Sequence, residues 1–232
     1  MAFSVETIAA MHVIVNKLKK RFGLKKVRVL DVPCGDMQYM SRFLEARSDI
    51  VYTGVDIVAD LIKHHRKTYA GRPWTFHRVD VVTDDFVNDF HLVISRSMMQ
   101  HLDNAAVFKI LGKLSARSRH PSFLLATTFS NWPLNYELNT HMRGRFRPVN
   151  LEIAPFRLEP PLCLLQDGPV PRRKTETKFM GLWRLPLMTV YESICSYNNV
   201  AKFSTALTAG TFYSCVNWKL NATSKTVIRD YL

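Results

Sequence analysis

Two hydrophobic periodicities alternate along the first 130 residues. Spacings of three and four predict an amphipathic helix over residues 3–22, from the apolar positions Ile8, Met11, Val15 and Leu18. Gly23 ends this helix, and a β-rich run at 27–32 predicts the first strand. The alternation continues with predicted strands at 49–56, 74–80, 91–95 and 122–128 and predicted helices at 37–44, about 59–69 and 104–118. Strands that alternate with helices indicate an α/β fold with a Rossmann-like, doubly wound, mostly parallel sheet.

The pattern changes after Phe129, where prolines repeatedly interrupt regular structure. We expect residues 130–186 to form a proline-rich insertion on the substrate side of the sheet, with two closing strands near 162–166 and 181–185. Residues 187–232 form a C-terminal extension of unknown role. The chain is therefore predicted to be a single domain, in which residues 1–24 form an N-terminal helix and residues 25–129 form the cofactor-binding core.

Composition excludes several classes of protein. With 47% hydrophobic and 22% charged residues among 232, the chain has enough apolar side chains for a core, unlike a disordered protein. The four cysteines are sparse and form no CxxC pair, which excludes a disulfide scaffold and a structural zinc site and favours a reducing compartment. We find no apolar run of membrane-spanning length and no export signal. These features predict a cytoplasmic protein, in the host cytoplasm for a viral one, with no membrane span.

The charge balance is the most unusual feature of the composition. Thirty-two Lys and Arg against 19 Asp and Glu give a formal net charge of +13. Such a field attracts polyanions, whether nucleic acid, an anionic surface or a phosphorylated substrate. Nucleic acid is the less favoured partner, because the chain contains no RRM, KH or zinc-finger signature.

Polar residues end the predicted parallel strands. Asp31, Asp56 and Asp80 end the first three strands, and Ser95 with Arg96 ends the fourth. Ligands of open parallel sheets bind at the carboxyl ends of the strands, where the strand order reverses, so these side chains are expected to share one crevice. Asp56 stands 25 residues beyond Asp31, which suits an acid that accepts both ribose hydroxyls of an adenosine-type cofactor. The alternative for Asp56 is to cap the following helix.

The turn after the first strand excludes two classes of cofactor site. It lacks the G-x-G-x-x-G pattern that rests a dinucleotide pyrophosphate on backbone amides, and the chain has no P-loop. A crevice with carboxylates and no phosphate cradle suits a cofactor that carries positive charge. S-adenosylmethionine carries a sulfonium and an ammonium, so we expect it to be the cofactor.

The segment that ends the first predicted strand resembles a known family motif. The segment VLDVPCGD at 29–36 resembles motif I of class I S-adenosylmethionine-dependent methyltransferases, in its D-x-P-C-G-D variant. The resemblance continues through 52–57, Asp80 and 95–102. Beyond the generic fold, the segments 147–151, 154–156 and 181–185 resemble a subgroup of small methyltransferases of bacteria and algal viruses that is associated with glycan O-methylation. It spans about residues 25–186, and the subgroup often has an acidic residue where Ser97 stands.

The resemblance implies an activity and a set of site residues. It implies methyl transfer from S-adenosylmethionine to a sugar hydroxyl of a glycan or glycan precursor, on a deoxyhexose such as rhamnose or fucose. An RNA or DNA methyltransferase and a non-catalytic cofactor-binding module are the alternatives. The implied cofactor contacts are Asp31, Pro33, Cys34, Gly35, Met37, Asp56, Ile57, Asp80, Val81, Ser95 and Arg96. The implied substrate contacts are Arg147, Asn150, Trp183 and Arg184.

Two residues are candidates for the proton acceptor. His101 follows the fourth strand, where a side chain can face both methyl donor and acceptor, and histidine suits a general base near neutral pH. Asp36 lies one residue beyond Gly35 and is the second candidate. The alternatives are a structural histidine at 101 and, for Asp36, a helix cap or a cofactor contact.

Other chemistry-bearing residues are assigned lesser roles. Cys34 is expected to line the cofactor, because no neighbour in the sequence activates it as a nucleophile. His64 and His65 are adjacent on a predicted helix and cannot share one face, so no metal site is expected. An arginine cluster in the insertion could hold phosphate or carboxylate, with a solvated loop as the alternative: Arg143, Arg145, Arg147 and Arg157.

Overall fold

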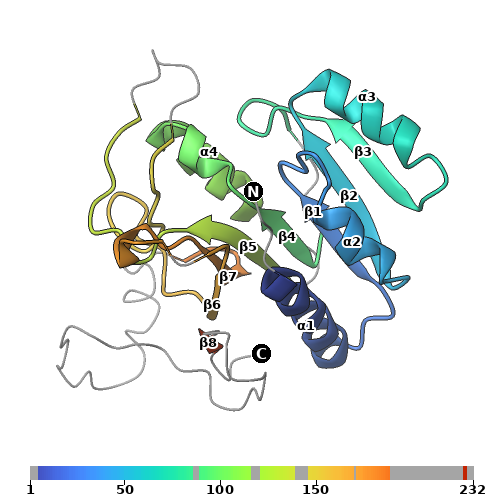
Figure 1. The fold of residues 1–232 in the computed structure, drawn as a ribbon, viewed down its shortest axis with the longest axis horizontal. Helices are drawn as coiled ribbons and strands as arrows, with labels where there is room; N and C mark the ends of the chain where they lie inside the picture. The colour runs from blue at the N-terminus through green and yellow to red at the C-terminus, as the bar shows by residue number, and fades with distance from the viewer. Residues whose placement is uncertain are drawn as a thin grey trace.

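The computed structural model describes residues 5–85, 89–115, 121–138, 146–169, 171–188 and 227–228. Their core is one eight-stranded sheet with the order β3-β2-β1-β4-β5-β7-β6-β8 (Figure 1). The parallel strands are β1 (Val27–Asp31), β2 (Ile50–Asp56), β3 (Trp74–Arg78), β4 (Leu92–Ser95) and β5 (Ser122–Thr128). The antiparallel strands are β7 (Phe179–Leu185), β6 (Cys163–Gln166) and β8 (Val227–Ile228). The predicted doubly wound, mostly parallel sheet is confirmed.

Helices cover both faces of the sheet. One face packs against α1 (Val5–Phe22), α2 (Met40–Glu45) and α3 (Ala59–Thr68), which bury side chains such as Leu18, Phe43 and Ile62 against it. The other face packs against α4 (Asn104–Ser115) and the apolar residues of the segment 149–158. Two short 3-10 helices, η1 (Met99–His101) and η2 (Lys174–Glu176), follow β4 and precede β7. Successive strand residues serve opposite faces, as Val29 and Leu30 of β1 do.

The element boundaries differ from the predicted ones in two instructive places. The helix expected from residue 37 begins at Met40, because Met37 has a φ of 60° and cannot be part of a right-handed helix. The strand expected to reach Asp80 ends at Arg78, and the Asp80 carboxylate instead accepts a hydrogen bond from the Val82 backbone N–H in a turn. Both differences lengthen the loops at the carboxyl edge of the sheet.

Several sequence predictions lie outside the described residues. These are the fates of Arg143, Arg145, Cys195 and Cys215, the end of the helix predicted to reach residue 118, and most of the extension 187–232. Within the extension, Val227 and Ile228 pair with β6 and so add an edge strand to the sheet. Cys34 and Cys163 are free and buried. In the described parts of the chain, no helix combines the length and apolar character needed to cross a membrane.

Candidate active site

The sheet brings Asp31, Asp56 and Ser95 to one edge. β1 lies between β2 and β4, with Asp31 beside Gly54 on one side and Ile94 on the other. Asp56 and Ser95 are the last residues of β2 and β4, so all three side chains stand at the carboxyl ends of neighbouring parallel strands. The order of the strands reverses between β1 and β4, which makes this edge the topological switch point where open α/β sheets bind ligands.

The turn after β1 is held over these strand ends by backbone bonds. The Val32 N–H donates to the Ile94 carbonyl at 2.8 Å, and the Cys34 N–H donates to the Val55 carbonyl at 2.9 Å. Gly35 follows in the left-handed region, with a φ of 53°, which glycine adopts without a steric penalty. The buried side chains of Cys34 and Met37 point into the core beside the turn. The turn is therefore a fixed platform at the strand ends.

Asp56 connects this turn to β2. Its carboxylate accepts hydrogen bonds from the Gly35 N–H at 3.2 Å and from the Val58 N–H at 3.0 Å. The next residue, Ile57, leaves 53% of its surface exposed. The predicted alternative for Asp56, a cap of the following helix, is not seen, because the N-cap of α3 is Val58 and no side chain caps that helix.

Two buried polar atoms at the switch point have no partner among the described residues. Asp31 is fully buried, and its Oδ2 accepts a hydrogen bond from the Tyr52 hydroxyl at 2.9 Å, whereas its Oδ1 is unpaired. The Ser95 hydroxyl, on the adjacent strand, is likewise buried and unpaired. Burial raises the pKa of Asp31 to about 8. Buried polar atoms without partners cost stability, so a cationic ligand group that bonds Asp31 Oδ1 fits this place.

The turn that follows β3 stands at the same edge of the sheet, next to the end of β2. The Asp80 carboxylate accepts the Val82 N–H at 2.9 Å, and this bond lowers the pKa of Asp80 below its ordinary value. Val81 is buried beside it. Predicted cofactor residues that are far apart in the sequence, at or just after the ends of four strands, thus lie at one edge of the sheet.

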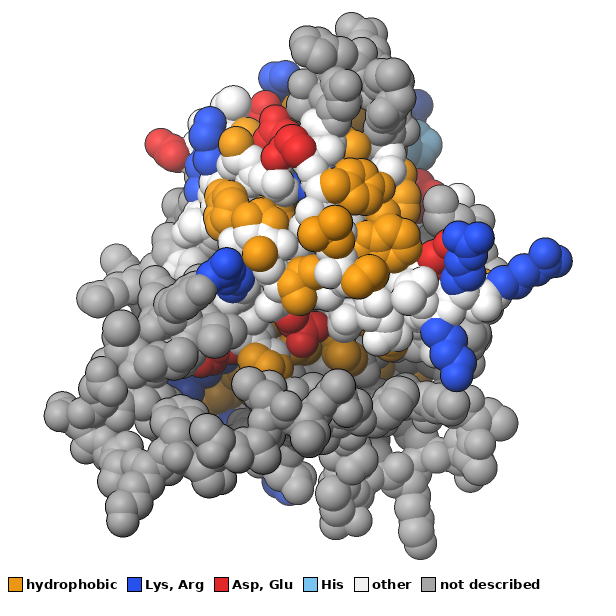
Figure 2. Space-filling view, turned by 90° about the vertical axis from the view of Figure 1, so that its left-hand side faces the viewer, with side chains coloured by type: hydrophobic (Ala, Val, Ile, Leu, Met, Phe, Trp, Pro, Cys, Tyr) orange, Lys and Arg blue, Asp and Glu red, His pale blue; other side chains and the backbone are white. Residues whose placement is uncertain are grey.

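An exposed aromatic side chain, Phe146, contacts residues that follow β4 and β5. His101, in η1 after β4, is exposed, and its ring lies 5.7 Å from that of Phe146 in an edge-to-face contact. Phe146 also contacts Phe129, the residue that follows β5, yet leaves 52% of its surface exposed. Leu134 and Tyr136 are exposed in the same loop segment. Figure 2 shows hydrophobic side chains gathered on the side where this segment and α4 lie in Figure 1.

Asp36, the second predicted proton acceptor, is exposed on the turn after β1. Its carboxylate accepts a hydrogen bond from the Gln38 backbone N–H at 3.1 Å. Because α2 begins only at Met40, Asp36 closes a turn instead of capping that helix. Cys34 has the opposite environment, since burial raises the pKa of its thiol and disfavours the reactive thiolate.

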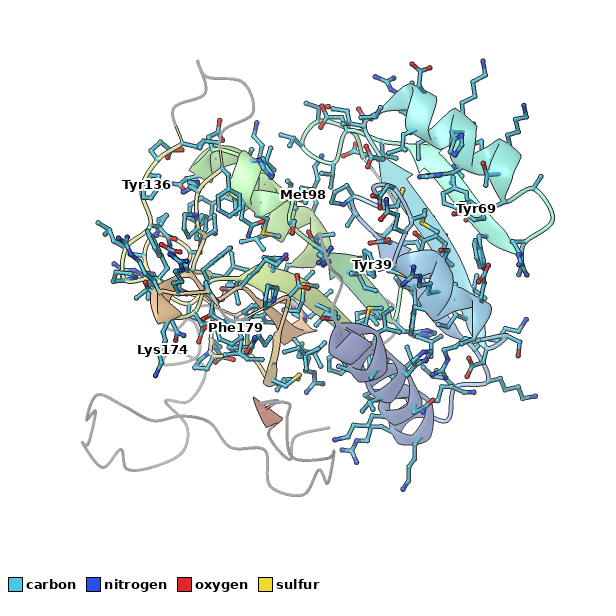
Figure 3. All side chains as sticks on the ribbon, in the orientation of Figure 1. Tyr39, Tyr69, Met98, Tyr136, Lys174 and Phe179 are labelled. Carbon is cyan, nitrogen blue, oxygen red and sulfur yellow. The ribbon has the colours of Figure 1, made fainter. Side chains whose placement is uncertain are left out.

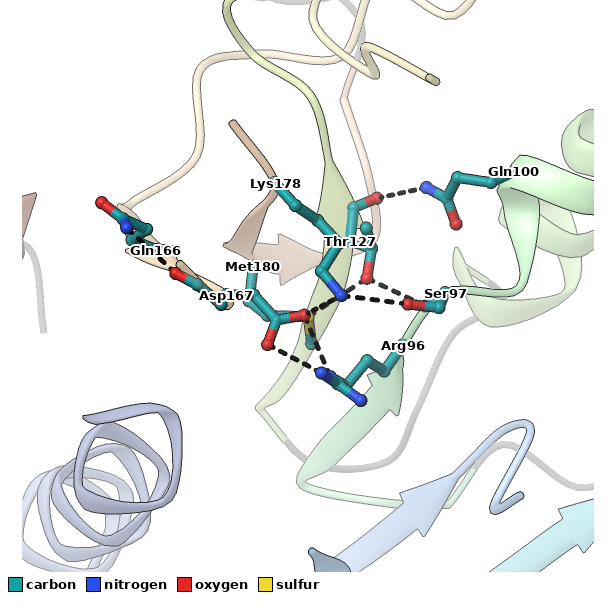
Figure 4. Close-up of polar contacts among 9 residues, drawn as sticks. Arg96, Ser97, Gln100, Thr127, Gln166, Asp167, Lys178 and Met180 are labelled. Carbon is teal, nitrogen blue, oxygen red and sulfur yellow. Dashed lines mark hydrogen bonds and ion pairs between the residues drawn. The ribbon is translucent and has the colours of Figure 1, made fainter. Parts of the chain in front are cut away.

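Arg96 contacts protein groups instead of open solvent. Its guanidinium lies 4.9 Å from the ring of Tyr39 and forms two hydrogen bonds with the Asp167 carboxylate, at 3.0 and 2.9 Å. Tyr39 lies near the middle of the molecule, beside α2 (Figure 3). Lys178 binds the same carboxylate at 2.9 Å, and Figure 4 shows the three residues together with Ser97.

Two of the four predicted substrate residues are buried in the fold. The Arg147 guanidinium donates to the backbone carbonyls of Tyr136 and, at 2.9 Å, Leu102. The Asn150 amide donates to two carbonyls of the segment 130–132. Both side chains hold the loop after β5 in place, and neither presents its polar group to a ligand.

The other two predicted substrate residues lie toward the opposite edge of the sheet. Trp183 pairs with Leu124 and Arg184 with Phe123, near the amino end of β5. The Trp183 indole N–H donates to the Glu159 carbonyl at 2.8 Å. Since β7 runs antiparallel to β5, its later residues lead away from the carboxyl ends of the parallel strands.

The structure also adds residues that the sequence did not single out for this site. His65 is buried on α3, and its Nε2 lies 2.6 Å from the Gly35 carbonyl oxygen, so it supports the turn after β1. Asp167 and Lys178 come from the β6–β7 connection. No local pattern could have revealed them, because they meet Arg96 only through the pairing of distant strands. Among the described residues, no three His, Cys, Asp or Glu side chains are grouped as metal ligands.

Comparisons with known proteins agree with this architecture. Residues 29–119 match the family model described as a methyltransferase domain. No curated protein matches the sequence. The match covers the turn after β1, the ends of β2 and β4, and α4. It confirms the predicted enzyme class, a methyltransferase that takes its methyl group from S-adenosylmethionine.

Three solved structures share the fold at low sequence identity. The PH0226 protein from Pyrococcus horikoshii OT3 is 17% identical, with a TM-score of 0.52 over 78% of this chain and 92% of that chain. The 1,6-didemethyltoxoflavin-N1-methyltransferase from Burkholderia thailandensis is 19% identical, with a TM-score of 0.50 over 76% and 78%. The N-methyltransferase NodS from Bradyrhizobium japonicum WM9 is 10% identical, with a TM-score of 0.53 over 77% and 87%. The last two structures contain S-adenosylhomocysteine.

Proposed function

We propose that this S-adenosylmethionine-dependent methyltransferase transfers its methyl group to a hydroxyl of a sugar, in a glycan or glycan precursor. A deoxyhexose such as rhamnose or fucose is the proposed acceptor. The observation that carries the proposal is the exposed Phe146 ring beside His101. An exposed aromatic face can cover the apolar face of a sugar ring, and exposed apolar side chains next to a cleft mark binding sites.

The resemblance supports the choice of a sugar acceptor. The segments 147–151, 154–156 and 181–185 resemble the glycan-associated subgroup of D-x-P-C-G-D methyltransferases. The first segment follows Phe146 directly and holds the loop on which that ring stands, through Arg147 and Asn150. In this proposal the segment therefore shapes the acceptor side without itself binding the sugar.

The donor side is assigned to the residues at the strand ends. Asp56 binds the ribose hydroxyls, and Ile57 and Val81 pack against the adenine with Asp80 at its rim. Asp31 bonds the ammonium, with Ser95 at the end of the neighbouring strand. Pro33, Cys34, Gly35 and Met37 form the turn on which the cofactor rests, and Arg96 closes the side next to Tyr39. When bound, S-adenosylmethionine supplies a methyl group on a positively charged sulfur.

The acceptor side needs orientation and a proton acceptor. Holding a hydroxyl oxygen in line with the methyl group removes much of the entropic barrier to the transfer. The His101 imidazole would take the hydroxyl proton as the oxygen–carbon bond forms and the sulfur–carbon bond of the donor breaks. Asp36, which is exposed on the turn after β1, is the substitute base.

A panel of acceptors tests the substrate class. The full chain is incubated with S-adenosylmethionine labelled in its methyl group and, separately, with deoxyhexosyl oligosaccharides, their fully hydroxylated counterparts and RNA. We expect label in the deoxyhexosyl products, and much slower labelling with Asp56→Ala or His101→Ala. Label that enters RNA alone, and is lost as salt is raised, would replace the sugar by the nucleic-acid alternative. Binding of S-adenosylmethionine without turnover on any acceptor would indicate a non-catalytic module.

A further inference from the structure

A three-membered ionic cluster lies at the carboxyl edge of the sheet. It consists of Arg96 after β4, Asp167 after β6 and Lys178 before β7 (Figure 4). β7 is antiparallel to β5, and its first residue, Phe179, pairs with the last residue of β5. Lys178 therefore stands beside the carboxyl ends of the parallel strands, at the same edge as the proposed methyl-transfer site.

The charges in this cluster do not balance. The Asp167 side chain is 1% exposed and accepts two hydrogen bonds from the Arg96 guanidinium. That geometry, with two parallel N–H to oxygen bonds, is a strong way for arginine to bind a carboxylate. Lys178 Nζ then binds an Asp167 oxygen at 2.9 Å that Arg96 already contacts. Two cations share one carboxylate, which leaves one positive charge in the cluster.

The Lys178 ammonium retains hydrogen-bonding capacity. It has three N–H donors, and its contacts within the described residues are with Asp167 and, at 3.5 Å, the Ser97 hydroxyl. Its side chain is 21% exposed, so the group is fixed yet accessible. Ser97 itself has a left-handed conformation, with a φ of 55°, and its N–H donates to Thr127 Oγ1 at 2.9 Å. Sparsely populated conformations of non-glycine residues cluster at ligand sites.

We propose that Lys178 binds an anionic group of the acceptor, so that the sugar that is methylated carries a carboxylate or a phosphate on itself or on the neighbouring unit. This inference rests on the proposed function and narrows its substrate class to acidic sugars. The clamp by Asp167 and Ser97 aims the ammonium, and the surplus charge supplies the attraction. The net charge of +13 adds a long-range field of the same sign.

Acceptor preference tests the proposal. Rates of methyl transfer are measured with three acceptors built on the same deoxyhexose: a neutral disaccharide, its counterpart with a uronic acid, and the nucleotide-activated sugar. We expect the wild-type protein to favour one or both anionic acceptors at least tenfold in kcat/KM. Lys178→Gln should remove that preference through a higher KM and leave the neutral acceptor unchanged, whereas Lys178→Arg should retain it. The uronic acid and nucleotide arms decide between carboxylate and phosphate.

A binding measurement separates this proposal from the proposed function. Glucuronate and inorganic phosphate are titrated calorimetrically into the full chain with S-adenosylhomocysteine present. Lys178→Gln should weaken binding of the preferred anion at least fivefold and leave the S-adenosylhomocysteine affinity unchanged. The control is Lys174→Gln, because Lys174 is an exposed lysine in η2, within the same connection between β6 and β7 (Figure 3). If no sugar is methylated but anion binding depends on Lys178, the sugar function falls and the anion site stands. Equal anion binding by wild type and Lys178→Gln overturns the inference.

Discussion

The Gly35 backbone N–H donates a hydrogen bond to the Asp56 carboxylate at 3.2 Å. This contact joins the turn after β1 to the end of β2, two segments that fold as neighbours only because their strands pair in parallel. The carboxylate also accepts the Val58 N–H, so its position is fixed from both sides. A fixed carboxylate is preorganised for ligand hydroxyls, which lowers the entropic cost of binding.

Replacing Asp56 should weaken cofactor binding. Asp56→Ala removes a charge-assisted acceptor for the ribose hydroxyls, and we expect a loss of about 1.5–3 kcal/mol in the free energy of S-adenosylmethionine binding by calorimetry. Asp60→Ala, an exposed carboxylate four residues further along on α3, is the matched control. An unchanged affinity for Asp56→Ala would contradict the placement of the ribose.

Cofactor binding should release a proton from Asp31. Burial raises the pKa of Asp31 to about 8, so the free protein carries this carboxyl protonated at pH 7. An ammonium bonded to Oδ1 favours the carboxylate and drives the proton off. Calorimetry in buffers of different ionisation enthalpy should therefore show proton release at about pH 6–7.5, where an α-amino group is still mostly charged, and affinity that rises with pH. Asp31→Asn should bind without this proton release, and equal release by both proteins would count against the assignment.

The same residue makes the stability of the ligand-free protein depend on pH. The unfolded chain loses the Asp31 proton near the ordinary pKa of 3.8, whereas the folded chain keeps it up to about 8. Ionisation is thus more costly in the folded state, and the contribution of Asp31 to stability falls as pH rises through that window. The midpoint temperature of thermal unfolding should be lower at pH 8 than at pH 5 for the wild type, and this decrease should be smaller for Asp31→Asn.

Loss of the His101 imidazole should slow the chemical step. His101→Ala is expected to lower kcat by about 10²–10⁴-fold with cofactor affinity nearly unchanged, as for removal of a general base. His64→Ala, an exposed histidine on α3, should leave kcat unaltered. A parallel fall in cofactor affinity would make His101 structural. A normal kcat for His101→Ala, with a large loss of kcat for Asp36→Asn, would make the Asp36 carboxylate the proton acceptor.

Activity should survive removal of divalent metals. The methyl group is activated by the positive charge on its sulfur, and the proposed residues supply orientation and a base without a Lewis acid. Methyl transfer is measured before and after dialysis against EDTA, and we expect equal rates. A loss that magnesium or manganese reverses would contradict this and would make Asp36 and Asp103 the first ligands to test.

Arg147 should matter for stability more than for substrate binding. Its buried guanidinium holds the carbonyls of Tyr136 and Leu102, and Arg147→Met leaves both acceptors without that donor. We expect a loss of about 2–4 kcal/mol in the free energy of unfolding, measured with denaturant. Arg184→Met, on an exposed position of β7, should change it by less than about 0.5 kcal/mol. An Arg147→Met protein with unchanged stability and a raised KM for the acceptor would instead support a substrate contact for Arg147.

The sequence by itself determined the succession of strands and helices along the chain and the residues at the strand ends. Each of these depends on a local pattern, a periodicity of two or 3.6 residues and the polar residue that closes an apolar run. Asp31, Asp56 and Ser95 could be placed at one edge, because parallel strands always bring their carboxyl ends together. The class of cofactor followed from the same local features.

Only the tertiary structure decided which side chains stand beside Arg96 at this edge of the sheet. Lys178 and Asp167 meet Arg96 across 71 or more residues of sequence, through the antiparallel pairing of β5, β6 and β7. The motif around Arg147 predicted a substrate contact, yet the Arg147 side chain is packed inward and donates to backbone carbonyls. Sequence patterns report which residues are apolar or charged over short distances. Which of them face each other depends on strand order and burial, and these are properties of the whole folded chain.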